Sequence, residues 1–138
     1  MWWIYALLSA FFASLTAIFA KIGIEHVDSD LATAIRTVVI VILAWAIVAV
    51  KGVIPGVQNL TKHNWTFLVL SGCATGLSWL FYFKALQVGK VTQVAPVDKL
   101  SVALSIILSV IFLKESLSLK DALGALLIVI GTFVLIIK

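Results

Sequence analysis

The chain has 138 residues, of which 63% are hydrophobic, and it carries only ten Lys or Arg and six Asp or Glu. A soluble domain is about a quarter charged, so this composition excludes an ordinary water-soluble domain. The basic residues are scattered singly, and a net charge of +4 in that pattern does not favour a nucleic-acid partner. One cysteine, Cys73, and two histidines give neither a disulfide nor a metal-ligand spacing, so we expect no metal and no cofactor.

Long apolar segments predict five transmembrane helices, because a spanning helix needs roughly 20 mostly apolar residues. The first segment has no basic residue before it and is longer than a signal-peptide core, so we do not expect it to be cleaved. None of the segments alternates as strands of a β-barrel would. The sequence therefore predicts an all-α integral membrane protein with one domain, 1–138, and helices at about 2–23, 31–50, 64–87, 91–113 and 118–137.

The connections between these helices are short, and two of them carry helix-start signals. Asp28, Ser29 or Asp30 is a suitable N-cap for the second helix. Ser118 is a suitable N-cap for the fifth helix, with Asp121 at its third position.

Several charged residues fall inside the predicted helices, and strict alternation of five spans places all of them toward the carboxyl-terminal side of the membrane. Val50 is the fourteenth residue after Arg36, which is about 21 Å of helix against a hydrocarbon core of about 30 Å. A charge facing lipid at that depth costs at least about 2–3 kcal/mol, so we expect Arg36 and Asp98 to face a shared interior. Arg36 and Asp98 form either part of a pathway or a structural ion pair, and Lys21 and Lys84 either line the pathway or reach the headgroups. The charged pathway candidates are Lys21, Arg36, Lys84, Asp98 and Lys99.

Hydroxyl side chains recur at helical spacing on two consecutive helices, which favours a polar cavity. The alternative is that each hydroxyl bonds its own backbone and serves packing. Trp79 lies deep in its helix as either a cavity wall or a packing residue. On the fourth helix, this stripe of hydroxyl side chains continues to Ser109. The further pathway candidates are Ser71, Thr75, Ser78, Trp79 and Tyr82 on the third helix, with Ser101 and Ser105 on the fourth.

The basic residues do not fix the orientation of the chain. Six of them fall on the carboxyl-terminal side and four on the other. Leaving out those inside the helices reverses the difference, so the positive-inside rule gives no firm answer. This is the pattern expected of a chain that inserts both ways.

Five short segments, with Gly124 and Gly131, resemble the EamA-type five-helix domain of drug/metabolite transporters, and their order covers the whole chain. One difference is that many such proteins have a proline in the middle of the fourth helix, where this chain reads SVALS at 101–105. The segments are FAKIG at 19–23, AIRT at 34–37, YFKAL at 82–86, VAP at 94–96 and FLKESL at 112–117.

The resemblance implies a single-domain bacterial or archaeal transporter in the cytoplasmic membrane, paired as a homodimer. Proton-coupled cation exchange through a glutamate in the first helix is not implied, because 2–23 contains no acid. We expect a secondary transporter that exports small polar metabolites, such as amino acids, from an inverted-symmetry dimer. The alternative is a non-transporting accessory or scaffold subunit. No catalytic set of residues is present, so we do not expect an enzyme.

Overall fold

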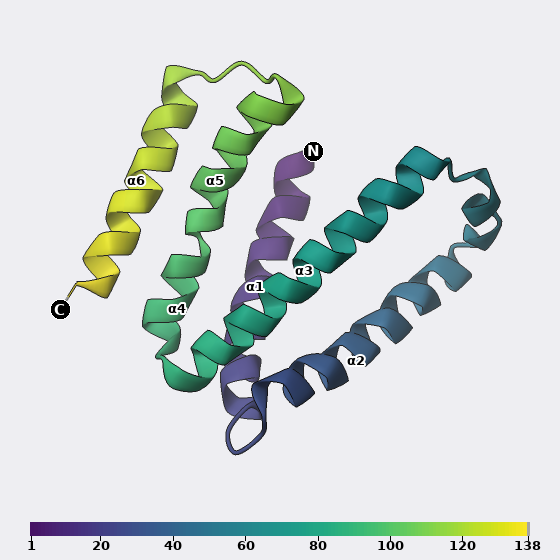
Figure 1. The fold of residues 1–138 in the computed structure, drawn as a ribbon, viewed down its shortest axis with the longest axis horizontal. Coiled ribbons are helices and arrows are strands. Elements are labelled where there is room, and N and C mark those ends of the chain that lie inside the picture. The colour runs from purple at the N-terminus through teal and green to yellow at the C-terminus, as the bar shows by residue number, and fades with distance from the viewer. Residues whose placement is uncertain (138) are drawn as a thin grey trace. The chain divides into compact units, whose positions relative to one another are not determined.

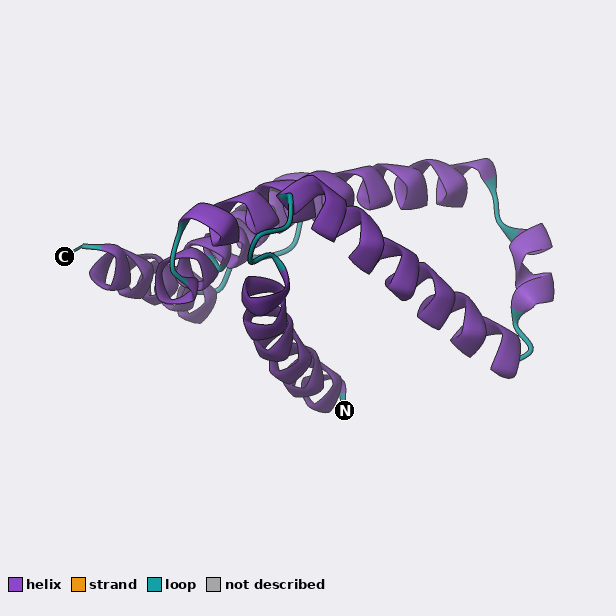
Figure 2. Cartoon of the chain, turned by 90° about the horizontal axis from the view of Figure 1, so that it is seen from below, coloured by secondary structure: helices purple, strands orange, loops and turns teal. Residues whose placement is uncertain are grey.

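The computed structural model describes residues 1–137, and every regular element in that range is a helix. Figure 2 shows these helices joined by short loops. Lys138, one of the six basic residues expected on the carboxyl-terminal side, lies outside the described residues. The helices are α1 (Trp2–Gly23), α2 (Ser29–Val50), the 3₁₀ helix η1 (Ile54–Asn59), α3 (Lys62–Val88), α4 (Val91–Asp98), α5 (Leu100–Leu108), the π-helical η2 (Ser109–Leu113) and α6 (Leu119–Ile136).

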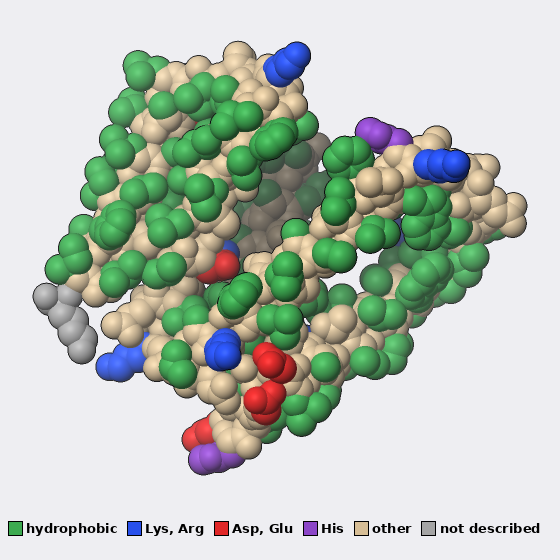
Figure 3. Space-filling model, in the orientation of Figure 1, with side chains coloured by type: hydrophobic (Ala, Val, Ile, Leu, Met, Phe, Trp, Pro, Cys, Tyr) green, Lys and Arg blue, Asp and Glu red, His purple; other side chains and the backbone are tan. Residues whose placement is uncertain are grey.

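Five helical spans in the described chain are long and apolar enough to cross a membrane, as predicted. Four of them are α1, α2, α3 and α6, and the fifth is the run Val91–Leu113. α2 and α3 each begin two residues before the predicted start. Figure 3 shows hydrophobic side chains spread across the whole visible surface, with charged groups at only a few places. A surface of this kind is stable where lipid replaces water, so the chain is a multi-pass membrane protein.

The chain divides into two compact units. One unit is Phe19–Gln87, which holds the end of α1, the whole of α2 and η1, and nearly all of α3. The other contains Met1–Ile18 and the chain from Val88 onward. The predicted single domain stays a prediction.

In the second of these units, α4 and α5 follow one another and both pack against α6 (Figure 1). The run is interrupted at Lys99, three residues after Pro96. Proline has no N–H, so Pro96 removes a hydrogen bond from the turn before it and does not by itself explain the break at Lys99. At Lys99 the helical turn is tighter, because hydrogen bonds join residues three apart. The Lys99 N–H donates to the Pro96 carbonyl and the Val102 N–H to the Lys99 carbonyl, both at 3.0 Å.

The helix starts confirm the capping predictions. Asp28 caps α2, and its Oδ1 accepts from the N–H groups of Asp30 at 2.9 Å and Leu31 at 3.1 Å. At α6 the Ser118 Oγ accepts from the Asp121 N–H at 3.2 Å, while Asp121 Oδ2 accepts from the Ser118 N–H at 3.1 Å. This reciprocal capping box satisfies donors that the first helical turn leaves open.

We predict that Ser118→Ala destabilises the folded protein by about 1 kcal/mol, because the cap at the start of α6 is lost. Thermal unfolding in detergent, followed by circular dichroism, measures the change. Ser116→Ala is the matched control in the same loop. Equal melting temperatures for the two variants would contradict the assignment of the cap.

Candidate functional site

The most informative side chain in the unit Phe19–Gln87 is Arg36, a charged residue inside a membrane-spanning helix. Its guanidinium carbon lies 4.2 Å from the centroid of the Trp79 ring and 5.2 Å from that of Phe83. Aromatic faces attract a cation through the ring quadrupole, by about 2 kcal/mol or more where water is excluded. The charge is thus held by two aromatic faces.

Helical spacing explains why these groups meet. Trp79 and Phe83 are four residues apart on α3, so they lie on one face of that helix. On α2, Arg36 shares a face with Ser29 and Thr33, both of which are buried. Local bonds satisfy this face, since the Thr33 hydroxyl donates to the Ser29 carbonyl at 2.8 Å. α2 therefore directs a buried polar face, ending in Arg36, toward the aromatic face of α3.

No carboxylate within Phe19–Gln87 forms an ion pair with Arg36. The three acids of this unit lie in or beside the connection between α1 and α2. Glu25 is 3.9 Å from the His26 imidazole, Asp28 caps α2, and Asp30 lies in the first turn of α2. The positive charge of Arg36 is therefore not cancelled inside its own unit.

Lys21 is held by a backbone group. Its ammonium donates to the carbonyl of Leu86 at 2.5 Å, and Leu86 is fully buried. Cations are favourable at the carbonyl end of a helix, which is where Leu86 lies in α3. Nearby, the Gln87 Nε2 donates to the Val27 carbonyl at 2.9 Å. These two bonds join the end of α3 to the end of α1 and the loop that follows it.

Lys21 also borders a cavity of about 410 Å³ at this end of the unit. Polar and charged groups of the α1–α2 connection share its wall with the end of α3. The lining residues are Lys21, Ile22, Ile24, Glu25, His26 and Gln87.

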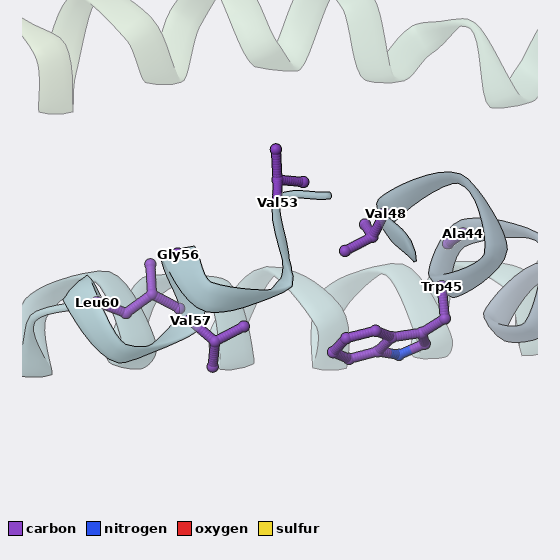
Figure 4. A pocket seen from close by; sticks show the side chains of 7 residues that line it. All are labelled: Ala44, Trp45, Val48, Val53, Gly56, Val57 and Leu60. Carbon is purple, nitrogen blue, oxygen red and sulfur yellow. The ribbon is translucent and has the colours of Figure 1, made fainter. Parts of the chain in front are cut away.

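The opposite end of α2 carries a different cavity, of about 300 Å³, between α2 and η1. Figure 4 shows its lining side chains, which are aliphatic apart from the Trp45 indole. No predicted site residue lines it, and its walls suit apolar rather than polar molecules. The lining residues are Ala44, Trp45, Val48, Val53, Gly56, Val57 and Leu60.

In the other unit, the interruption between α4 and α5 carries both predicted charges. The Lys99 ammonium lies 3.3 Å from Asp98 Oδ2, so these neighbours pair with each other. The hydroxyl of Thr132 on α6 donates to the Pro96 carbonyl at 3.2 Å and to the Ile128 carbonyl at 2.8 Å. A cavity of about 390 Å³ lies beside this interruption, and its lining includes Pro96, Lys99, Gly131 and Thr132. The broken helix is thus stabilised from α6.

Arg36 and Asp98 belong to different units. Their expected shared interior therefore stays a prediction.

The hydroxyl stripes are only partly explained. Ser71, Thr75 and Ser78 are exposed, and Tyr82 is half-buried. The Thr75 hydroxyl donates to the Ser71 carbonyl at 2.9 Å, which matches the alternative of self-satisfied packing for that residue.

On α5, Ser101 and Ser105 are exposed, and in η2 the Ser109 hydroxyl donates to the Ile106 carbonyl at 2.9 Å. Lys84 is exposed in the last turns of α3. Their predicted place along a pathway stays a prediction.

Sequence reasoning missed Phe83 and Thr132. The four-residue spacing of Trp79 and Phe83 was a usable signal for the aromatic face. Nothing in the sequence around Thr132 indicates that its hydroxyl satisfies a carbonyl 36 residues away. Within residues 1–137, no three His, Cys, Asp or Glu side chains gather in a way that suits a metal ion.

We predict that Lys21→Met lowers the stability of the protein by about 1.5–3 kcal/mol, since a charge-assisted hydrogen bond to a buried helix end is lost. Unfolding in a graded series of sodium dodecyl sulfate, followed by circular dichroism, measures this change. The matched control is Lys84→Met, in an exposed position. A Lys21→Met protein as stable as the control would show that the bond to Leu86 contributes nothing.

Comparison with known proteins identifies the family. The model of the EamA-like transporter family matches residues 1–137. An uncharacterized transporter in the cobO 3′ region of Sinorhizobium sp. is 49% identical over 134 residues, covering 97% of this chain and 95% of that protein. An uncharacterized protein of Methanocaldococcus jannaschii is 30% identical over 135 residues, covering 98% and 96%. No solved structure was found to be similar. The chain therefore belongs to the EamA-like transporter family.

Proposed function

We propose that this protein is a secondary transporter that exports small polar metabolites by alternating access, with two copies in inverted orientation forming the pathway. The observation that carries the proposal is the Arg36 guanidinium, which lies inside a membrane-spanning helix against Trp79 and Phe83. A charge at this depth is costly and marks a substrate or ion pathway in membrane proteins. A subunit that only packs against other proteins has little need of it.

The test is transport by the purified protein in proteoliposomes. A panel of labelled polar metabolites is followed in both directions, with Arg36→Ala compared with the wild type. Lys120→Ala, an exposed change in the first turn of α6, is the control. We expect movement of at least one metabolite that Arg36→Ala abolishes and Lys120→Ala retains. No movement of any metabolite would favour the accessory-subunit alternative.

A substitution at Asp98 tests whether this residue acts in transport or only in stability. Its pair with Lys99 is partly exposed, with 36% of the Asp98 side chain accessible, and such pairs contribute about 0–1 kcal/mol. We therefore predict that Asp98→Asn abolishes transport while the melting temperature stays nearly unchanged.

Asp121→Asn is the matched control for the Asp98 experiment. It weakens the capping box of α6, so its melting temperature falls while transport per folded molecule persists. Loss of stability in Asp98→Asn, in step with its activity, would assign Asp98 a structural role.

The proposed assembly is an antiparallel homodimer. Strict alternation of five spans leaves the intramembrane charges of one copy near one side, so a single copy has charged groups at one mouth only. An inverted second copy supplies the same groups at the other mouth. Inverted symmetry of this kind is common among secondary transporters.

The weak bias of the basic residues removes the usual obstacle to dual insertion. The alternative is that Lys51, Lys62, Lys114 and Lys120 hold their side in the cytoplasm, which gives a single orientation and a parallel or heteromeric assembly. We predict that reporters active only in the cytoplasm and only in the periplasm, each fused to the carboxyl terminus, give comparable signals. Adding two lysines to one loop between helices is the positive control and drives the signal to one side. A single-sided signal from the unmodified chain would exclude the antiparallel homodimer.

A further inference from the structure

The guanidinium of Arg36 has hydrogen-bonding capacity that its own unit does not use. Trp79 and Phe83 contact it through aromatic rings, and a ring face has no lone pair comparable to a carboxylate oxygen. Guanidinium carries five N–H donors in a planar fork. Within Phe19–Gln87, none of these donors bonds a carbonyl, hydroxyl or carboxylate oxygen. The site therefore presents a positively charged fork backed by two rings.

The charge of the surrounding spans has the same sign. Lys21, Arg36 and Lys84 are the charged residues inside the spans of this unit, apart from those in the first turns of α2 and α3. Lys21 already donates to the Leu86 carbonyl, and Lys84 is exposed near the end of its helix. A low-dielectric region with an excess of positive charge attracts anions. Arg36 is the member of this set that lies deepest from the ends of its helix.

The depth of Arg36 favours a soluble anion over a lipid headgroup. It is the eighth residue of α2, so about 10 Å of helix lies between it and the start of the span. Headgroup phosphates stay at the interface, whereas a small anion inside a transport pathway passes this level. A planar fork binds a carboxylate through two parallel hydrogen bonds, which a lysine cannot do.

We infer that Arg36, held against Trp79 and Phe83, is the specificity-determining residue for substrates that carry a carboxylate, which binds the open edge of the guanidinium. This inference rests on the proposed transport function. The rings fix the plane of the fork, and the carboxylate supplies the missing acceptors.

The test compares acids with their uncharged amides on the unmodified protein, so it does not depend on any variant folding. Purified protein is placed in nanodiscs of phosphatidylcholine. Thermal stabilisation is then measured with phenylalanine, leucine, glutamate and succinate, and with the matching amide of each. We expect at least one acid to raise the melting temperature and its amide to have no effect at the same concentration.

Two substitutions locate the site. Arg36→Gln is expected to weaken binding of that acid by about tenfold or more, the effect of removing a charge-assisted hydrogen bond. Arg36→Lys keeps the charge but loses the fork, and its affinity falls between the wild type and Arg36→Gln. Lys120→Gln, outside the site, retains the wild-type affinity.

The outcomes that overturn the inference are distinct. Acids and amides that stabilise equally, acids that never stabilise, or acids that bind Arg36→Gln as well as the wild type each refute it. A second set of nanodiscs contains phosphatidylglycerol. Stabilisation by this lipid that depends on Arg36, without any acid effect, assigns the site to a headgroup and also refutes it.

Failure of the proposed function gives a different result. If carboxylates bind in a way that depends on Arg36 but no metabolite crosses the vesicle membrane, the transport function is refuted and the binding site stands. If metabolites with and without a carboxylate are transported equally, the carboxylate site is refuted and the transport function stands.

Discussion

A guanidinium inside a membrane-spanning helix, held by aromatic rings, is the constraint on which the unit Phe19–Gln87 depends. Lipid offers no partner for a charge, so the helices must supply one. α3 supplies it through Trp79 and Phe83. At the same end of the unit, Lys21 on α1 bonds the Leu86 carbonyl on α3. Gln87 on α3 bonds the Val27 carbonyl in the loop after α1. The polar links between helices thus gather at one end, while the cavity at η1 is lined by apolar groups.

In the other unit, the polar group that needs a partner within the protein is a backbone carbonyl. A broken helix inside a membrane exposes carbonyls that must find donors within the protein. Pro96 lies in α4 and the chain tightens at Lys99, where the Pro96 carbonyl receives the Lys99 N–H and the hydroxyl of Thr132. α6 is therefore more than an apolar neighbour of α4, because its Thr132 hydroxyl bonds a carbonyl next to the interruption.

Features set by neighbouring residues were predictable from the sequence, whereas features set by distant residues were not. Span boundaries depend on local hydrophobicity, and the caps at Asp28 and Ser118 depend on the next three residues. The partner of Arg36 depends instead on how α2 and α3 align, which no local pattern encodes. Lys21 bonds a backbone carbonyl, and every residue has one, so no side-chain pattern marks that acceptor.

The two cations of the unit Phe19–Gln87 illustrate how the choice of residue reveals its role. Lysine is a compact charge with donors that point in many directions, and at position 21 it bonds the Leu86 carbonyl at the buried end of α3. Arginine is planar, stacks on aromatic rings and still presents donors at its edge. At position 36 the stacking is present and the edge has no acceptor in its own unit. Lys21 thus closes a helix end, whereas the open edge of Arg36 is the part that we propose binds the substrate.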